Sequence, residues 1–329
     1  MFISFSDGSI QEIGSNGRSN SIRYSGRVLV NDFQTEIDRL LQLSVAPSTA
    51  RQYGVALRLF NEFRREHMLE TIWPVPLEDI MSFIAYMFRL ELSHSTINCY
   101  ISGLSFHHKI SNLTDNTQLF VVRKLLEGVK RSKRQLDKRL PITIKLLDRI
   151  LAILPCVCSS RYEAKLFLSV FSLAFYGLFR VGELTVGPKG MDAHTIKIEN
   201  VKVHLDGIEL FLATSKTDQF GRGLTIFISE QGNVNSCPVI NLNEFLKVRP
   251  SGGGPLFGHF DRSPLTRYQF TSVMKKCLHT LGIEETQYAS HSFRIGMATT
   301  CAMKGVSDDQ IKMYGRWKSD AYARYIRIP

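Results

Sequence analysis

The sequence of 329 residues contains no uninterrupted apolar run of about eighteen residues, the length that a membrane-spanning helix needs. Its most apolar stretch, residues 164–179, still contains Lys165, Ser169 and Ser172, which favours a buried helix. The N-terminus also lacks a basic segment followed by an apolar run, so we expect no secretory signal. These absences predict a folded protein that makes no use of a membrane.

Cysteine pairs with metal-binding spacing are also missing. None of the six cysteines forms a CxxC pair, and Cys156 and Cys158 have no matching second pair or nearby histidines. A structural zinc site is therefore not expected, and a reduced, intracellular protein is the simplest interpretation. We interpret the adjacent His107 and His108 as helix-surface residues rather than as metal ligands.

Acidic residues are few relative to basic ones. The chain has 30 Asp and Glu against 41 Lys and Arg, a formal net charge of +11, with an isoelectric point near 9.4. An excess of this size favours a polyanionic partner, although a soluble basic protein without one has the same composition. The clustering of the charges has to decide between these two interpretations.

The first half of the chain divides into a polar segment and a helical domain. Residues 1–30 are rich in Ser, Gly and Asn and cannot bury much apolar surface, so we expect them to be disordered. Residues 31–130 show apolar positions three or four apart, which predicts a small helical bundle. The expected helices cover residues 49–63, 77–90, 93–109 and 119–129.

A basic segment follows the bundle. Eight basic residues lie between Arg123 and Arg139, and only Glu127 and Asp137 oppose them. Most charge runs are solvated linkers, but this one lies at a domain boundary, so we favour a strap that contacts phosphates over residues 131–141. The DNA-contacting side chains expected from it are Lys130, Arg131, Lys133, Arg134, Lys138 and Arg139.

Residues 142–329 mix helix and strand and are predicted to form the second domain. Helices are expected at residues 144–154 and 161–176, and again from Arg267 to the end. Residues 195–204, 208–214 and 224–228 alternate apolar and polar side chains, as half-buried strands do, and Asp206-Gly207 is a hairpin turn signal. The predicted fold class is mainly α with a small antiparallel β-sheet.

Two candidate site residues come from the middle of this domain. Arg180 ends a buried apolar helix, where a guanidinium is costly unless it pairs or binds an anion, and Glu183 is placed to orient it. A structural ion pair explains the same pattern. Lys216 lies in a loop after the second strand, where it could donate a proton or be an ordinary surface lysine.

The last forty residues carry the densest set of candidates. His291 and Arg294 share one helix face at a spacing of three, and the rigid fork of an arginine matches phosphate oxygens. Trp317 is either a core residue or an indole N–H donor, and its charged neighbours Arg316 and Lys318 favour a position near the surface. Tyr325 is a phenol flanked by arginines, which suits either an activated nucleophile or an aromatic anchor.

Together, the order and spacing of these residues resemble the tyrosine recombinase, or phage integrase, family. The family pattern is an arginine in an R-x-x-E context, a lysine at a β-hairpin, H-x-x-R, a His or Trp, and a nucleophilic tyrosine. The matching positions here are Arg180 with Glu183, Lys216, His291 with Arg294, Trp317 and Tyr325. The helical half resembles the family's SAM-like core-binding domain.

Details of the last residues refine the resemblance. The segment from Gly315 to Arg327 is most similar to recombinases of eukaryotic mobile elements of the DIRS and Crypton types. Trp317 and Tyr325 are one residue closer than is common in the family, so Tyr322 stays a second candidate for the nucleophile. Only four residues follow Tyr325, where many relatives have a further helix that docks on a neighbouring subunit.

The resemblance implies a site-specific recombinase that cleaves and rejoins DNA through a 3′-phosphotyrosyl bond, without metal, ATP or another cofactor. It also implies double-stranded DNA as the partner and a homotetramer on two DNA sites. The nucleus is the expected location in a eukaryote, and the cytoplasm or nucleoid otherwise. Two alternatives remain, a recombinase-derived DNA-binding protein without catalysis and a type IB topoisomerase-like enzyme.

Overall fold

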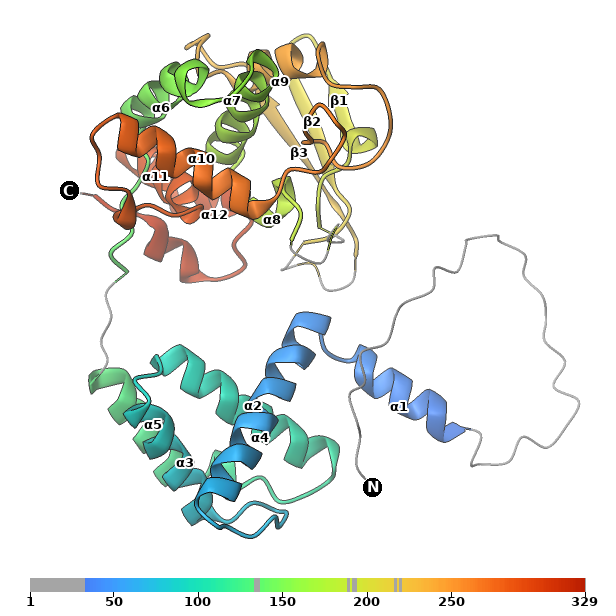
Figure 1. The fold of residues 1–329 in the computed structure, drawn as a ribbon, viewed down its shortest axis with the longest axis vertical. Helices are drawn as coiled ribbons and strands as arrows, with labels where there is room; N and C mark the ends of the chain where they lie inside the picture. The colour runs from blue at the N-terminus through green and yellow to red at the C-terminus, as the bar shows by residue number, and fades with distance from the viewer. Residues whose placement is uncertain are drawn as a thin grey trace, which may run out of the picture. The chain divides into compact units, whose positions relative to one another are not determined.

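The computed structural model describes residues 33–132, 137–187, 190, 194–215, 218 and 221–328. The chain folds as two compact units, Met1–Leu136 and Asp137–Pro329. The break falls within residues 131–141, the expected strap, whereas the expected disordered segment 1–30 lies outside the described residues. The predicted fold class, mainly helical with a small antiparallel sheet, is confirmed (Figure 1).

The first unit is a bundle of helices around an aromatic core. Its helices are α1 (Phe33–Leu43), α2 (Pro47–Glu66), α3 (Leu77–Arg89), α4 (His94–Ile110) and α5 (Phe120–Ser132). Phe60 and Phe63 of α2 pack against Phe83 of α3, with ring centroids 5.0 and 5.3 Å apart. The helical periodicity therefore predicted the buried face correctly. The start of α2 differs slightly, because Pro47 occupies the first turn and no side chain caps it.

His108 corrects one expectation for this unit, because it is fully buried rather than on the helix surface. Its Nδ1 lies 2.8 Å from the Leu104 carbonyl oxygen, and its Nε2 accepts the Val75 backbone N–H at 3.0 Å. Two backbone groups therefore satisfy both ring nitrogens, which offsets the cost of burying the imidazole. His107 is partly buried against Trp73, with ring centroids 4.2 Å apart.

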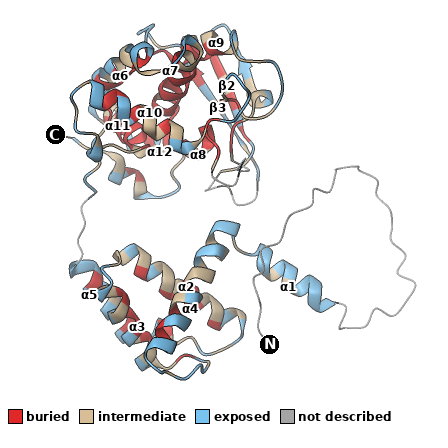
Figure 2. Ribbon diagram, viewed as in Figure 1, coloured by how far each residue is buried: buried red, intermediate tan, exposed pale blue. Residues whose placement is uncertain are grey.

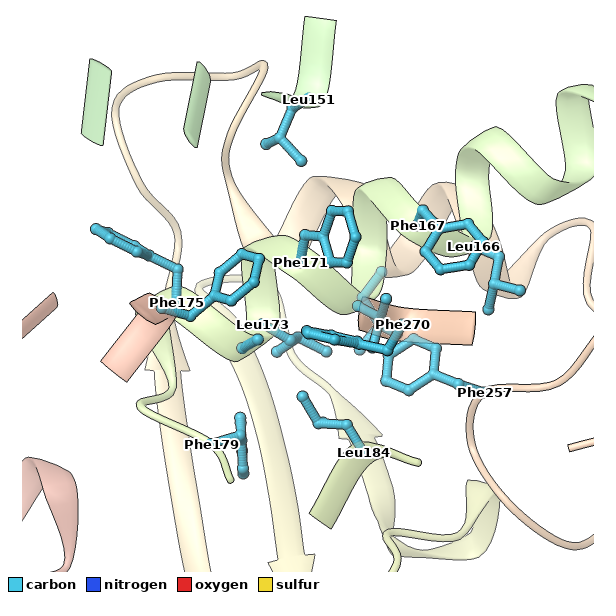
Figure 3. Packing of buried hydrophobic residues seen from close by; sticks show 14 of the residues in the cluster. Leu151, Leu166, Phe167, Phe171, Leu173, Phe175, Phe179, Leu184, Phe257 and Phe270 are labelled. Carbon is cyan, nitrogen blue, oxygen red and sulfur yellow. The ribbon is translucent and has the colours of Figure 1, made fainter. Parts of the chain in front are cut away.

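The second unit is built around helix α7 (Arg161–Tyr176), whose side chains from Ala164 to Phe175 are largely buried. Helices α6 (Ile144–Val157), α9 (Pro238–Leu246) and α11 (His291–Met303) pack around it. Phe171 contacts Phe270 of α10 (Arg267–Thr280) edge-on, at 4.9 Å between centroids (Figure 3). Figure 2 shows this buried centre in red. Residues 164–179 therefore form a core helix, as their interrupted apolar pattern indicated.

A three-stranded antiparallel sheet covers one side of this core in the order β1 (Val201–Val203), β2 (Gly207–Leu212) and β3 (Leu224–Ser229). Val201 pairs with Leu210, and Gly207 pairs with Ser229. The expected strand over residues 195–204 shortens to three residues, because Ile198–Asn200 forms a 3-10 turn. The loop between β2 and β3 carries Lys216, which lies outside the described residues.

A small apolar cluster joins the C-terminal elements. Tyr322, in the 3-10 segment η5 (Asp320–Tyr325), packs with Ile311 of α12 (Asp308–Gly315) and Ala298 of α11. Leu178, in the turn after α7, belongs to the same cluster. The cluster therefore brings the turn before the four-residue helix α8 (Val181–Leu184) next to the end of the chain. None of the described helices is long and apolar enough to cross a membrane.

Candidate active site

Arg180 and Glu183 form the first part of the site, at the start of α8. The Arg180 backbone N–H donates to Glu183 Oε2 at 2.9 Å, and its Nη1 donates to Glu183 Oε1 at 3.1 Å. Glu183 is buried, whereas the Arg180 side chain keeps 21% of its surface exposed. The ion pair is therefore structural, and it also presents a guanidinium with further N–H donors to solvent.

His291 and Arg294 come from the first turn of α11, where Phe293 points into the core between Phe171 and Phe270. Arg294 is only 1% exposed. Its Nη2 donates to the Gly315 carbonyl at 2.9 Å, and its Nη1 donates to the Leu178 carbonyl. These two bonds use two of the five guanidinium N–H groups, and the Nε has no partner among the described residues.

Tyr325 lies against three of the other predicted site residues. Its ring centroid is 5.0 Å from the Trp317 ring, 5.6 Å from the Arg294 guanidinium carbon and 6.1 Å from the His291 ring, which it meets edge-on. Thr299 of α11 fixes the surrounding backbone, because its Oγ1 donates to the Tyr325 carbonyl and accepts the Arg327 N–H at 2.9 Å. The phenol is therefore held beside three cationic or N–H-donating groups.

Tyr322, the second candidate for the nucleophile, has a different environment. It is 7% exposed, and its ring faces the Lys312 ammonium, whose nitrogen lies 5.0 Å from the centroid. The neighbouring carboxylate of Asp308 raises the pKa of the Tyr322 phenol, which disfavours the phenolate. The surroundings of Tyr322 thus suit an aromatic anchor better than an attacking group.

The site carries an excess of positive charge. The guanidinium groups of Arg180, Arg294 and Arg316 interact with one another, and Glu183 opposes them. Burial, followed by the charges of Arg180 and Arg316, lowers the pKa of Arg294 to about 9. Arg294 therefore stays cationic at neutral pH, although the neighbouring guanidinium groups repel it. An anion would relieve this repulsion, and a phosphate presents oxygens that match the unused N–H groups.

His291 is held neutral by the same charges. Burial, followed by the guanidinium groups of Arg139, Arg294, Arg267 and Arg180, lowers the pKa of His291 to about 4. At pH 7 its ring therefore has one N–H donor and one acceptor nitrogen. A neutral imidazole can donate to a phosphate oxygen without adding another charge to the cluster.

The expected strap is only partly described. Lys130 and Arg131 are exposed at the end of α5, and Lys138 is exposed at the start of the second unit, whereas Lys133 and Arg134 lie outside the described residues. Arg139 contacts the carboxylate of Asp137 with two nitrogens, each at 2.8 Å. Its guanidinium also interacts electrostatically with Tyr325 and His291, so this strap residue borders the site.

Arg316 is the site residue that the sequence interpretation missed. The charges of Arg316 and Lys318 favoured a position near the surface for Trp317, which is half-buried, whereas the Arg316 side chain is only 6% exposed. The Arg316 guanidinium can be buried because Glu183 and two backbone carbonyls accept its hydrogen bonds inside the fold. The Gly-Arg-Trp sequence between two helical segments was the available signal.

Metal ligands do not cluster in the described part of the chain. No group of three or more His, Cys, Asp or Glu side chains is placed there to hold an ion, and the six cysteines are free thiols. Burial raises the pKa of the Cys158 and Cys277 thiols to about 12, so these two behave as inert apolar side chains.

Sequence comparison identifies a relative that aligns along most of the chain. The chain is 24% identical over 304 residues to an integrase/recombinase XerD homologue of Selenomonas ruminantium, and the alignment covers 88% of this chain and 84% of the relative. No protein-family model matches the chain.

Solved structures with the same fold include recombinases and integrases. XerH bound to a palindromic difH substrate matches with a TM-score of 0.61 at 15% identity, over 88% of this chain and 80% of XerH. A lambda integrase dimer bound to a COC′ core site matches with a TM-score of 0.57 at 16% identity, over 89% and 94% of the two chains. The Tn1549 transposon integrase in complex with right-end DNA also scores 0.57, at 15% identity over 88% and 95%.

The sequence likeness spans both units, the fold is that of these enzymes, and the structure gathers Arg180, Glu183, His291, Arg294, Trp317 and Tyr325 at one place. The chain therefore has the fold of these recombinases and integrases, and its sequence is similar along most of its length to an integrase/recombinase XerD homologue.

Proposed function

We propose that this protein is a site-specific DNA recombinase that cleaves and rejoins strands through a covalent bond between Tyr325 and a 3′-phosphate. The observation that carries the proposal is the position of the Tyr325 ring, in contact with Trp317 and close to the Arg294 guanidinium and the His291 ring. A phenol needs nearby cations and donors to attack a phosphodiester, and this cluster supplies both.

The proposed chemistry is an exchange of one phosphodiester bond for another. Arg180 and Arg294 bind the non-bridging oxygens, and Trp317 and the N–H of His291 add donors that stabilise the pentavalent transition state. The acceptor nitrogen of the neutral His291 can take the phenolic proton as Tyr325 attacks phosphorus. The bond to the 5′-oxygen breaks, and that oxygen leaves as a hydroxyl with a proton from Lys216.

Reversal of the same step rejoins the strands. The attacking group is then a 5′-hydroxyl, from the same strand or from a partner strand, and Tyr325 leaves. The phosphotyrosyl bond conserves the energy of the broken phosphodiester, so the cycle should run in EDTA and without ATP. Lys216 enters this scheme through the family resemblance alone.

The duplex and the assembly complete the proposal. Lys130, Arg131 and Lys138 are exposed and can neutralise phosphates of a bound duplex, as the basic composition favours. We infer a homotetramer on two DNA sites, and the dimer of lambda integrase on its core site supports assembly on DNA. The link to eukaryotic mobile elements, and with it a nuclear location, rests on the Gly315–Arg327 segment only.

Covalent trapping tests the proposed function. The protein would be incubated in EDTA with labelled duplexes that carry the end sequences of the element encoding it, nicked next to the expected cleavage position. A released short strand diffuses away, so the phosphotyrosyl intermediate accumulates as a slow band on a denaturing gel. We expect this band with the wild type and with Tyr322→Phe, and none with Tyr325→Phe.

Native gels on the same duplexes provide the control for binding, since both variants should bind DNA like the wild type. A band with Tyr325→Phe but not with Tyr322→Phe would transfer the nucleophile to Tyr322. Binding by the wild type without a covalent band would instead favour a DNA-binding protein that has lost catalysis. Relaxation of supercoiled plasmid without recombinant products would indicate a topoisomerase-like enzyme.

A further inference from the structure

Arg316 occupies an unusual position between two predicted site elements. It follows α12 and precedes Trp317, and its backbone has a φ of 58°, in the left-handed region. A non-glycine residue there is strained, and its side chain is buried. Such a residue needs compensating interactions, which makes its contacts informative.

The polar contacts of its side chain converge on the short segment Gly177–Glu183. Nη1 donates to the Gly177 carbonyl at 3.1 Å, and Nη2 donates to the Leu178 carbonyl at 3.1 Å and to Glu183 Oε2 at 2.9 Å. The guanidinium carbon also lies 5.0 Å from the centre of the Phe179 ring. This is the segment that ends in Arg180 and its carboxylate partner.

Glu183 therefore lies between two arginines. Its Oε1 accepts Arg180 Nη1, and its Oε2 accepts both the Arg180 backbone N–H and Arg316 Nη2. A carboxylate bound on both sides has little freedom to rotate, so the direction of the Arg180 guanidinium depends on Arg316. Leu178, whose φ is 47°, offers its carbonyl to Arg316 and to Arg294 together.

The backbone of Arg316 also determines where Trp317 lies. The left-handed turn folds the indole back over Gly315, where any Cβ would overlap the six-membered ring. The Trp317 backbone N–H donates to the Lys312 carbonyl at 3.0 Å, and the Arg294 guanidinium carbon lies 4.6 Å from the indole centre. One residue thus connects the segments that carry Arg180 and Trp317.

We propose that Arg316 is a positioning residue of the strand-cleavage site, which orients Arg180 through Glu183 and holds Trp317 beside Tyr325. The proposal rests on the proposed function. The bidentate, planar guanidinium suits this role because it reaches two carbonyls and a carboxylate at once, which a lysine ammonium cannot match in direction. Removing it leaves Glu183 paired with Arg180 alone, takes the side-chain donor from the Gly177 carbonyl, and leaves the Leu178 carbonyl to Arg294.

The test compares Arg316→Met and Arg316→Lys with the wild type on a nicked duplex. Both variants face the same backbone strain, because neither is glycine, and Lys318→Met removes an equal charge at an exposed neighbouring position as the control. Two quantities are measured separately, the equilibrium Kd for DNA and the single-turnover rate constant of covalent adduct formation at saturating protein. The rate constant does not depend on the fraction of protein that is folded.

Arg316→Met should lower the rate constant about 100-fold, the effect of a small misplacement of catalytic groups, with little change in Kd. Arg316→Lys should recover part of that loss, and Lys318→Met should cleave like the wild type. If Arg316→Met does not fold, the rate constant of Arg316→Lys still tests the proposal, because it should be lower than that of the wild type. Unchanged rate constants in the Arg316 variants would overturn the proposal.

A double-mutant cycle separates positioning from general destabilisation. Because Arg316 acts on Arg180 through Glu183, Arg316→Met should slow the Arg180→Lys variant far less than it slows the wild type. Full additivity, within about twofold, would show that Arg316 does not act through Arg180 and would overturn the proposal. The absence of any adduct with the wild type would instead refute the proposed function, so the two failures are distinguishable.

Discussion

At the scale of single residues, the site is a set of cations held close together by one carboxylate. Glu183 is bound by Arg180 and Arg316, while Arg294 uses two backbone carbonyls as its partners. Carbonyl dipoles offset only part of a buried positive charge, so the cluster favours an incoming anion before any substrate is present. The site is therefore preorganised for phosphate at the expense of its own electrostatic stability.

Burial and the positive charge of this cluster make the contribution of His291 to folding stability depend on pH. Its pKa of about 4 lies below the ordinary value of 6.5, so the unfolded chain binds a proton at His291 between these pH values and the folded chain does not. This contribution should reduce stability as the pH falls from about 6.5 to about 4. Bound DNA, which adds negative charge, should raise the His291 pKa.

NMR titration of the imidazole signals checks this expectation, with His291→Asn used to assign the resonance. In the free protein the midpoint should lie near 4, and it should move upward in the complex of Tyr325→Phe with DNA. Urea unfolding at pH 7 and about pH 4.5 should show a smaller acid sensitivity in His291→Asn than in the wild type. A titration midpoint of His291 near the ordinary value of 6.5 in the free protein would contradict the positively charged environment described for this residue.

The residue types at the site could be predicted from sequence, whereas their surroundings could not. R-x-x-E and H-x-x-R are local patterns, and each pair does share one short element here. Burial of Arg294 and Arg316 depends on carbonyls more than a hundred positions away in the chain, at Gly177 and Leu178. Local sequence carries no information about such partners, so the burial of Arg316 could not be predicted from its neighbours in the chain.

At the scale of elements, the segment that carries Tyr325 is attached to the rest of the unit at several points. Thr299 of α11 bonds to the backbone on both sides of Ile326. Arg327 Nη2 donates to Asp137 Oδ2 at 3.0 Å, and the same carboxylate binds Arg139. Asp137 thus joins the start of the second unit to the end of the chain, and the Arg139 interaction lowers the Asp137 pKa to about 2.

Asp137→Asn should loosen this attachment. The amide keeps a similar shape but loses the charge that holds Arg327 and Arg139, so the segment around Tyr325 should open more often. We expect faster hydrogen exchange at the Arg327 amide and slower adduct formation, with DNA affinity nearly unchanged. Glu244→Gln, which removes an exposed carboxylate paired with Lys165 and Lys247 away from the Tyr325 segment, is the matched control. Equal exchange in both variants would contradict a role for Asp137.

The helices with long apolar periodicity were predicted within a few residues, and the shorter elements were not. Residues 161–176 were expected as a helix and form α7 with those bounds. Helix α9 was missed, since Pro238–Leu246 has only nine residues and too few turns for a periodic pattern. Strand β1 is shorter than expected because local turn geometry over Ile198–Asn200 overrides the alternation.

At the scale of the whole molecule, two units with separate cores share a net charge of +11. Exposed Lys130 and Arg131 belong to the end of the first unit, and Lys138 belongs to the start of the second. Basic side chains next to the junction can contact phosphates without reading bases, so they should contribute affinity rather than sequence preference.

The salt dependence of DNA binding measures this contribution. If Lys130 and Arg131 each neutralise one phosphate, replacing both by Gln should reduce the slope of log K against log salt by about 1.8. The loss should be equal for target and unrelated duplexes. Lys247→Gln, which removes an exposed charge from the end of α9, should leave the slope unchanged. A slope that stays the same in the double variant would remove these residues from the DNA contact.

The indole of Trp317 occupies the space that a Cβ at position 315 would need, which has an evolutionary consequence. Among relatives that keep this turn, a tryptophan at position 317 should occur together with glycine at position 315, because a larger residue there would meet the ring. Loss of the large ring would free position 315 to vary. The two positions should therefore vary together, and an alignment of relatives measures this directly.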